Sequence, residues 1–184
     1  MKIKIRHSKP EDIDNVYNLH TQCFTPSDHW YKAAIRNYLD NGIIIENKAD
    51  NMIIGVLLQG TMKACNDMIE IDENENEYKE DIFEHVNELG RLFHMNKTHK
   101  RELPGIMMIC VHPSFRGKGL GQKLIEKHFL ENKEKIICLN TRRSNINAYS
   151  LYKKMGYIQI AFIKNKYFQP DEDSIFMIKD LTSY

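Results

Sequence analysis

The chain has only four cysteines in 184 residues, no long apolar run and almost no net charge. Cys23, Cys65, Cys110 and Cys138 lie far apart, and none belongs to a C-x-x-C pair with metal-ligand spacing. Two of them, Cys110 and Cys138, stand within apolar runs, where a cysteine usually packs as a small hydrophobic residue. We therefore expect a reducing compartment, the cytoplasm, and no bound metal.

The charge balance and hydropathy exclude two further classes of partner. A formal net charge of +1 gives no general attraction to polyanions, and the basic run at 97–101 is short. No apolar stretch approaches the ~20 residues that a membrane-spanning helix needs. We expect a protein without nucleic-acid or membrane partners.

The length favours a single domain over residues 1–184.

The spacing of apolar residues predicts a mixed α/β fold. Strands are expected over 3–5, 43–45, 53–58, 106–111, 135–141, 157–164 and 174–179, and helices over about 10–23 and 119–132. A further helix is expected to be capped by 144–147 and to run to 154. The stretch Thr25-Pro26-Ser27-Asp28 is expected to end the first helix and to cap another, which carries Trp30, Tyr31, Ile35 and Tyr38. Residues about 68–101 are strongly acidic at first and then amphipathic, which predicts an inserted segment with a helix and a solvated face.

The segment from Val111 to Gln122 gives the clearest functional signal. It places Gly117, Gly119 and Gly121, with two basic residues, between a predicted strand and a predicted helix. Glycine lets backbone N–H groups converge on an anion at a helix N-terminus. The spacing fits neither the dinucleotide G-x-G-x-x-G nor the G-x-x-x-x-G-K-[ST] loop. The segment therefore predicts a pyrophosphate-binding turn, and a glycine-rich turn without a ligand is the alternative.

This R-x-x-G-x-G pattern after an apolar strand resembles the acetyl-CoA loop of the GNAT superfamily of N-acetyltransferases. The segment from Asn147 to Tyr157 is similar to the N-A-x-x-L-Y-x-x-x-G-[FY] segment of the same superfamily, in the right order and about 30 residues downstream. The resemblance covers nearly the whole chain except 68–101. It implies an α/β (α+β) GNAT fold, in which helices flank a mixed, mostly antiparallel central sheet with splayed middle strands.

The resemblance also implies roles for individual residues, with acetyl-CoA as cosubstrate and no metal. Tyr152 would protonate the departing CoA thiolate, although a tyrosine at this helical position can also be simple core packing. His112 is expected to be a strand-end residue rather than a base. The implied cofactor contacts are Ile109, Cys110 and Val111 on the strand, Arg116, Gly117, Lys118, Gly119, Leu120, Gly121 and Gln122 in the loop, and Asn147 on the later helix.

Three other segments resemble protein N-terminal acetyltransferases of the ribosomal-protein-alanine and Nat types. These are Leu139–Asn145, similar to L-E-V-R-x-S-N, Lys164–Phe168, similar to K-N-x-Y-Y, and a first-helix loop starting with Cys23-Phe24-Thr25-Pro26. The resemblance implies that Phe24, Tyr31, Asn140, Tyr167 and Phe168 contact the acceptor. Ordinary packing is the alternative for the aromatic residues.

The chain departs from this pattern where a general base is expected. Asn140 replaces the usual glutamate or histidine, and Gly105 replaces the tyrosine of many Nat-type members. An α-amine has a pKa near ~8, against ~10.4 for lysine, so its deprotonation through water is feasible. Glu102 is a candidate distal base.

The sequence thus predicts an enzyme that transfers acetyl from acetyl-CoA to the N-terminal α-amine of a protein or peptide in a ternary complex. Two alternatives stay open. One is acetylation of a small amine, such as a polyamine, amino sugar or aminoglycoside, and the other is a noncatalytic acyl-CoA-binding subunit. An auxiliary subunit or a homodimer also stays open.

Overall fold

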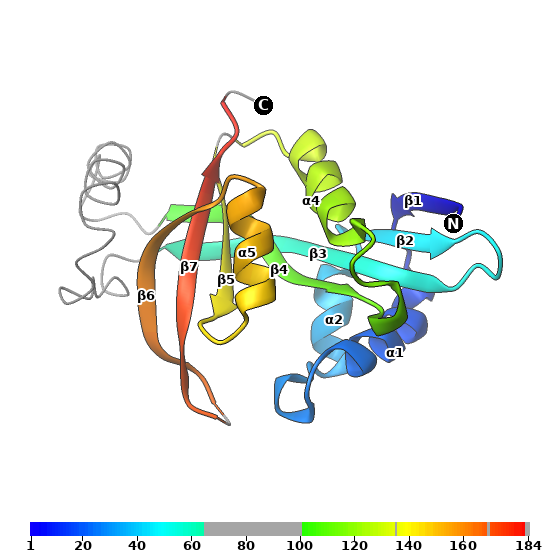
Figure 1. Cartoon of the computed structure of the whole chain (residues 1–184), viewed down its shortest axis with the longest axis horizontal. Coiled ribbons are helices and arrows are strands. Elements are labelled where there is room, and N and C mark those ends of the chain that lie inside the picture. Colours follow the sequence, from blue (N-terminus) through cyan, green and yellow to red (C-terminus); the bar gives the residue numbers. More distant parts are fainter. Residues whose placement is uncertain (65–100, 135, 169, 183–184) are drawn as a thin grey trace. The chain divides into compact units, whose positions relative to one another are not determined.

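The computed structural model describes residues 1–64, 101–134, 136–168 and 170–182 (Figure 1). These residues form two compact units. The first holds residues 1–61, 104–134 and 181–182, and the second holds 62–64, 101–103 and 136–180 apart from 169. The predicted inserted segment lies outside the described residues, except that Arg101 begins a strand. The expectation of a single domain stays a prediction.

The first unit holds β1 (Ile3–His7), β2 (Ile43–Asn47) and most of β3 (Ile53–Ala64) and β4 (Arg101–Val111), which neighbour one another in this order. The β1–β2 and β2–β3 pairs are antiparallel. Ile5 lies opposite Ile45, and Ile44 lies opposite Val56. The predicted hairpin of 43–45 and 53–58 is therefore confirmed.

Helices cover both faces of this sheet (Figure 1). The helices α1 (Ile13–Cys23) and α2 (Lys32–Leu39) share one apolar cluster with β2, β3 and β4. On the other face, α4 (Leu120–Glu131) places Leu124 3.4 Å from where a Cβ on Gly55 would be. Each of these three helices is preceded by a short 3-10 helix. The 3-10 helices are Pro10–Asp12 before α1, Pro26–Asp28 before α2 and Pro113–Phe115 before α4.

The start of α2 differs from the prediction. Trp30 and Tyr31 lie before the helix, and the backbone of Tyr31 is extended. Of the four residues expected on this helix, Ile35 and Tyr38 lie on α2. The Tyr31 carbonyl accepts bonds from the N–H groups of Ala34 and Ile35, which makes Tyr31 the N-cap. The Trp30 N–H instead donates to a side chain of α1, so a tertiary contact overrides the helical spacing of the aromatic residues.

The second unit contains β5 (Ile136–Arg142), α5 (Ile146–Lys154), β6 (Ile158–Tyr167) and β7 (Glu172–Asp180). Its strands lie in the order β5-β7-β6 and pair antiparallel. A second apolar cluster joins these strands to Leu103. The predicted mixed α/β fold with a mostly antiparallel sheet is confirmed. None of the helices in the described ranges is long and apolar enough to cross a membrane.

Candidate functional site

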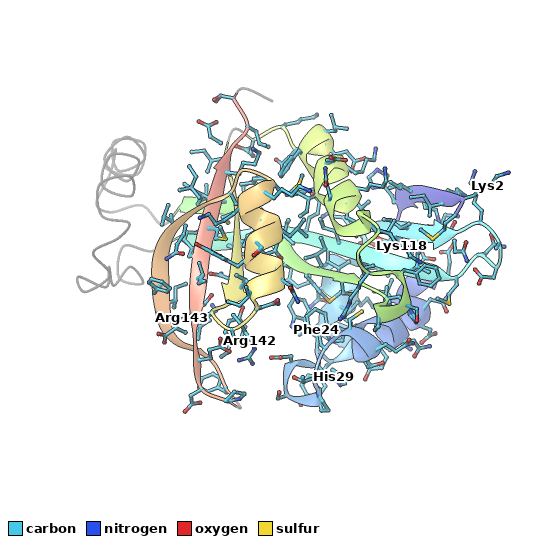
Figure 2. All side chains as sticks on the ribbon, viewed as in Figure 1. Lys2, Phe24, His29, Lys118, Arg142 and Arg143 are labelled. Atoms are coloured by element: carbon cyan, nitrogen blue, oxygen red, sulfur yellow. The ribbon has the colours of Figure 1, made fainter. Side chains whose placement is uncertain are left out.

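The glycine-rich loop between β4 and α4 has the backbone that an anion site requires. Gly117 and Gly119 have φ values of +72° and +73°, in the left-handed region, and Gly119 is the N-cap of the twelve-residue α4. A Cβ at either position would meet nothing within 4 Å, so the need for glycine is conformational. Lys118 is exposed beside them (Figure 2). An open turn with free helix N–H groups and a cation fits a pyrophosphate.

Arg116 ties this loop to the ends of two other elements. Its Nε donates to the Val111 carbonyl at 3.1 Å, and its Nη2 donates to the Cys23 carbonyl at 3.4 Å. The Cys23 thiol also donates to the Val111 carbonyl, at 3.4 Å. The sequence indicated Arg116 as positive charge and as a cofactor contact of the loop. The structure shows that it also connects the C-terminal ends of β4 and α1 in the first unit.

The three predicted cofactor contacts on β4 differ in the burial of their side chains. Ile109 and Val111 are half-buried, whereas the side chain of Cys110 is buried in the cluster beneath α1 and α2. A hydrogen bond from the Cys110 thiol lowers the pKa of Cys23, and the same bond, with burial, raises the pKa of Cys110. Only the backbone of Cys110 is therefore suited to a ligand.

His112 directly follows β4, at the position expected for a strand-end residue. Its Nδ1 accepts a bond from the Ser114 N–H at 3.3 Å and caps the short 3-10 helix. This bond gives the imidazole a structural partner.

The loop between α1 and α2, residues 24–31, presents its two predicted acceptor contacts differently. Phe24 is half-buried against the apolar cluster and lies 4.8 Å, between ring centroids, from His20. The Tyr31 side chain is 85% exposed. Packing accounts for the position of Phe24, but it does not account for that of Tyr31.

In the second unit, Tyr152 lies on α5 with only 5% of its surface exposed. Its ring meets that of Tyr157 edge-on at 5.8 Å. Burial, with a smaller contribution from Tyr167, raises the pKa of Tyr152, so its hydroxyl keeps its proton at neutral pH. Asn147 is exposed on the first turn of α5, which Asn145 caps by accepting a bond from the Ala148 N–H.

Asn140 is half-buried on β5, and its amide is already bonded at both ends. Nδ2 donates to the Met62 sulfur at 3.4 Å, and Oδ1 accepts from the Ser174 hydroxyl at 3.3 Å. These partners hold the amide in one orientation. The backbone of Glu102 lies on β4, and its side chain is outside the described part of the chain.

The turn between β6 and β7 holds the other two predicted acceptor contacts. Phe168 is 72% exposed, and Tyr167 lies under the guanidinium of Arg142, 4.3 Å from the ring centroid. Arg142, labelled in Figure 2, also forms a salt bridge with Glu172 at 3.2 Å. The Glu172 carboxylate in turn accepts bonds from the backbone and hydroxyl of Ser144.

Glu172 thus links the β5–α5 connection to the β6–β7 turn. Its partial burial acts to raise its pKa, but the bonds from Ser144 and Arg142 outweigh this and hold the pKa below its usual range. The sequence did not single out Glu172, because nothing in its local pattern shows which distant groups it meets. Among the described residues, no group of three or more His, Cys, Asp or Glu side chains is placed to hold a metal ion.

Comparison with known proteins finds similar acetyltransferases. The family model of the acetyltransferase (GNAT) domain matches residues 80–159, a stretch that contains both the glycine-rich loop and the Asn147–Tyr157 segment. Over 182 residues the chain is 26% identical to a protein of Bacillus subtilis (strain 168) that is provisionally named as a ribosomal protein bS18-alanine N-acetyltransferase. That alignment covers 96% of this chain and 94% of the relative. In sequence the chain is therefore similar to GNAT acetyltransferases.

Solved structures confirm the GNAT fold. The ribosomal-protein-S18-alanine N-acetyltransferase from Escherichia coli matches with a TM-score of 0.68 at 14% identity, over 100% of this chain and 96% of that chain. The Arabidopsis thaliana NAA60 structure in complex with acetyl-CoA matches with a TM-score of 0.70 at 16% identity, over 97% and 99% of the two chains. The matched GNAT domain and the N-acetyltransferase relative indicate acetyltransferase activity.

Proposed function

We propose that this acetyltransferase acts in the cytoplasm on the N-terminal α-amine of a protein or peptide, with acetyl-CoA as the donor. The observation that carries the proposal is the likeness, over 96% of the chain, to a relative named for the alanine of a ribosomal protein. The exposure of Tyr31 and Phe168 supports it, because large aromatic side chains left in water are typical of surfaces that bind a partner.

The glycine-rich loop would bind the pyrophosphate of the donor. Backbone N–H groups from Gly117 to Gln122 would supply the hydrogen bonds, since the Arg116 N–H already donates to the Pro113 carbonyl. The N-terminal end of α4 adds a favourable dipole. The backbone of Ile109 to Val111 would pair with the pantetheine arm, and Asn147 would contact the same arm. Donor binding supplies the thioester that the amine attacks.

Tyr152 would act as the general acid. As the amine nitrogen bonds to the acetyl carbon, the carbon–sulfur bond breaks, and the Tyr152 hydroxyl gives its proton to the sulfur. Solvent then returns a proton to the phenolate. The raised pKa of Tyr152 keeps the proton available at neutral pH until the sulfur gains charge.

Deprotonation of the amine would occur through water. The described part of the site presents an amide at Asn140 and no side chain at Gly105, and neither group takes up a proton. An α-amine with a pKa near ~8 is partly neutral at physiological pH, so it needs little assistance. Glu102 would assist as a distal base.

Acceptor recognition would use Phe24, Tyr31, Asn140, Tyr167 and Phe168. The contact between Arg142 and the Tyr167 ring supports this assignment, because it fixes one aromatic face at the β6–β7 turn. Flat aromatic faces with fixed amides suit an extended peptide backbone and its first side chain.

The test is release of free CoA from acetyl-CoA against a panel of short peptides with varied first residues, polyamines, amino sugars and aminoglycosides. Activity that depends on the first residue of the peptide is the expected result. Activity on small amines alone would show that the acceptor is not a peptide. Acetyl-CoA binding without turnover on any amine would instead indicate a noncatalytic acyl-CoA-binding subunit.

A further inference from the structure

We propose that His20 is a positioning residue that sets the conformation of the α1–α2 loop, residues 24–31, and thereby the affinity for the acceptor. The inference rests on the proposed function, since it takes this loop to contact the acceptor through Tyr31. His20 lies in the predicted first helix, but outside the segments whose resemblance pointed to the cofactor or the acceptor.

His20 holds the far end of the loop by a single defined bond. It lies on α1 with 1% of its surface exposed, and its Nε2 accepts a hydrogen bond of 2.8 Å from the backbone N–H of Trp30. A backbone N–H can only donate, so Nε2 is unprotonated and the neutral ring carries its hydrogen on Nδ1. Burial, with a smaller effect of His29, lowers the pKa of His20 to about 4, which keeps the accepting form present at neutral pH.

Two further residues of the loop pack around the same imidazole. The ring centroids of Phe24 and His29 lie 4.8 and 5.6 Å from that of His20. His29 Nε2 lies 3.0 Å from the Phe24 carbonyl, and both residues are seen on this loop in Figure 2. The loop therefore folds around one buried polar ring.

The polar character of His20 adds little to packing. Its Nδ1 has no hydrogen-bond partner among the described residues, although the atom is buried. A buried N–H without a partner is costly, and an apolar side chain would avoid that cost. The bond to Trp30 is therefore the specific contribution of this histidine.

The bond from the Trp30 N–H to His20 affects Tyr31, the proposed acceptor contact, because Tyr31 is the next residue along the chain. With the Trp30 N–H directed at His20, Tyr31 adopts an extended conformation and α2 begins at Lys32. The Tyr31 side chain then points into solvent, 85% exposed. Without the bond, Trp30 and Tyr31 are free to join the helix that their spacing favours, and the Tyr31 ring would be displaced.

The experiment compares His20→Leu, which removes the acceptor, with His20→Gln, whose Oε1 can replace Nε2. His128→Leu is the matched control, because His128 is another histidine with 0% exposure in the same unit, bonded to Gln59 on the opposite face of the sheet. We expect His20→Leu to raise the peptide KM about tenfold while kcat and the Kd of acetyl-CoA change less than twofold. His20→Gln should restore the peptide KM to within about threefold, and His128→Leu should leave it unchanged.

A second readout does not depend on activity. Trp30 is the only tryptophan of the chain, so its fluorescence reports on this loop. The emission should shift to longer wavelength in His20→Leu and stay unchanged in His20→Gln and His128→Leu.

An unchanged peptide KM in His20→Leu, a failure of His20→Gln to restore it, or an equal rise in His128→Leu would each overturn the proposal. If the peptide panel yields no substrate, the proposed function fails and the link to the acceptor fails with it. Trp30 emission then still decides separately whether His20 sets the loop.

Discussion

At the scale of single residues, Tyr152 combines a buried position with a raised pKa. We expect Tyr152→Phe to lower kcat by about 100-fold, in the range typical of a lost general acid, because the thiolate would leave without a proton. The Kd of acetyl-CoA, measured by calorimetry, should change less than twofold.

Tyr149→Phe is the matched control for this prediction. Tyr149 lies on the same helix, but its hydroxyl donates to Gln159 at 3.0 Å. Its loss should leave kcat within about twofold. An equal fall in kcat in both variants would assign the effect to α5 as a whole.

The sequence predicted the types of residue at the site better than their partners. A motif singled out Tyr152, but no local pattern could show that Asn140 bonds to Met62 and Ser174, which lie 78 and 34 positions away. The same limit applies to Arg116, which bonds to the carbonyls of Cys23 and Val111 as well as carrying charge. Long-range partners depend on the fold, and periodicity does not contain them.

At the scale of elements, the turn before α4 depends on two left-handed residues. Gly119→Ala should lower the free energy of unfolding by ~1 kcal/mol, because an L-residue in this conformation is strained even with open space around it. The Kd of acetyl-CoA should rise about fivefold as the N–H groups lose their alignment. Chemical denaturation and calorimetry measure the two effects.

Lys118→Ala separates backbone shape from charge in the same loop. Lys118 is exposed, so its loss should weaken acetyl-CoA binding at low salt and leave the stability unchanged within ~0.5 kcal/mol. If Gly119→Ala behaved in this way too, the left-handed backbone would not be what the loop requires.

The β6–β7 turn gives a prediction about acceptor binding. Glu172→Gln removes the charge that holds Arg142 and Ser144, so the Tyr167 ring should lose its fixed orientation. We expect the peptide KM to rise about fivefold, equivalent to ~1 kcal/mol, with an unchanged Kd for acetyl-CoA. Asp171→Asn, at an exposed neighbouring position, is the control, and an equal effect there would point to general charge rather than to the bond network.

Most elements were predictable because their apolar residues follow strand or helix periods. The boundaries that failed have physical causes outside those periods. The helix α2 begins after Tyr31 because the Trp30 N–H is bound by His20, and β4 begins at Arg101, before the apolar run that marked it. Neither a hydrogen-bond acceptor from a distant part of the chain nor a polar strand end can be recognised from the spacing of apolar residues.

At the scale of the whole molecule, the pH dependence of stability follows from groups in the first unit. Burial lowers the pKa of both His20 and His128 to about 4. The hydrogen bonds from Arg6, against the opposing effect of burial, lower the pKa of Asp12. Trp30 lies in the same unit as these residues, so its fluorescence during urea unfolding reports on them.

The two groups act in different pH windows. In the unfolded chain the two histidines bind protons below pH ~6.5, whereas in the folded chain they stay neutral down to about pH 4. The free energy of unfolding should therefore fall as the pH drops from about 6.5 to 4. The loss should be on the order of 3 kcal/mol for each histidine. The stabilisation from the Asp12 carboxylate is present above its unfolded pKa and should be lost as the pH falls further, through its lower folded pKa.

Two variants assign the windows and serve as controls for each other. His128→Gln should make the slope between pH 6.5 and 4 shallower and leave the acid limb unchanged, because the amide of glutamine does not titrate. Asp12→Asn should lower stability at pH 7 by ~2 kcal/mol, since Arg6 loses a partly buried partner, and should flatten the limb below pH 4. The free energy of unfolding of His128→Gln could instead depend on pH between 6.5 and 4 as it does in the unaltered protein. In that case His128 would have to titrate alike in the folded and unfolded chain. Its buried ring would then be open to water, and the packing of α4 on the sheet would differ from the structure.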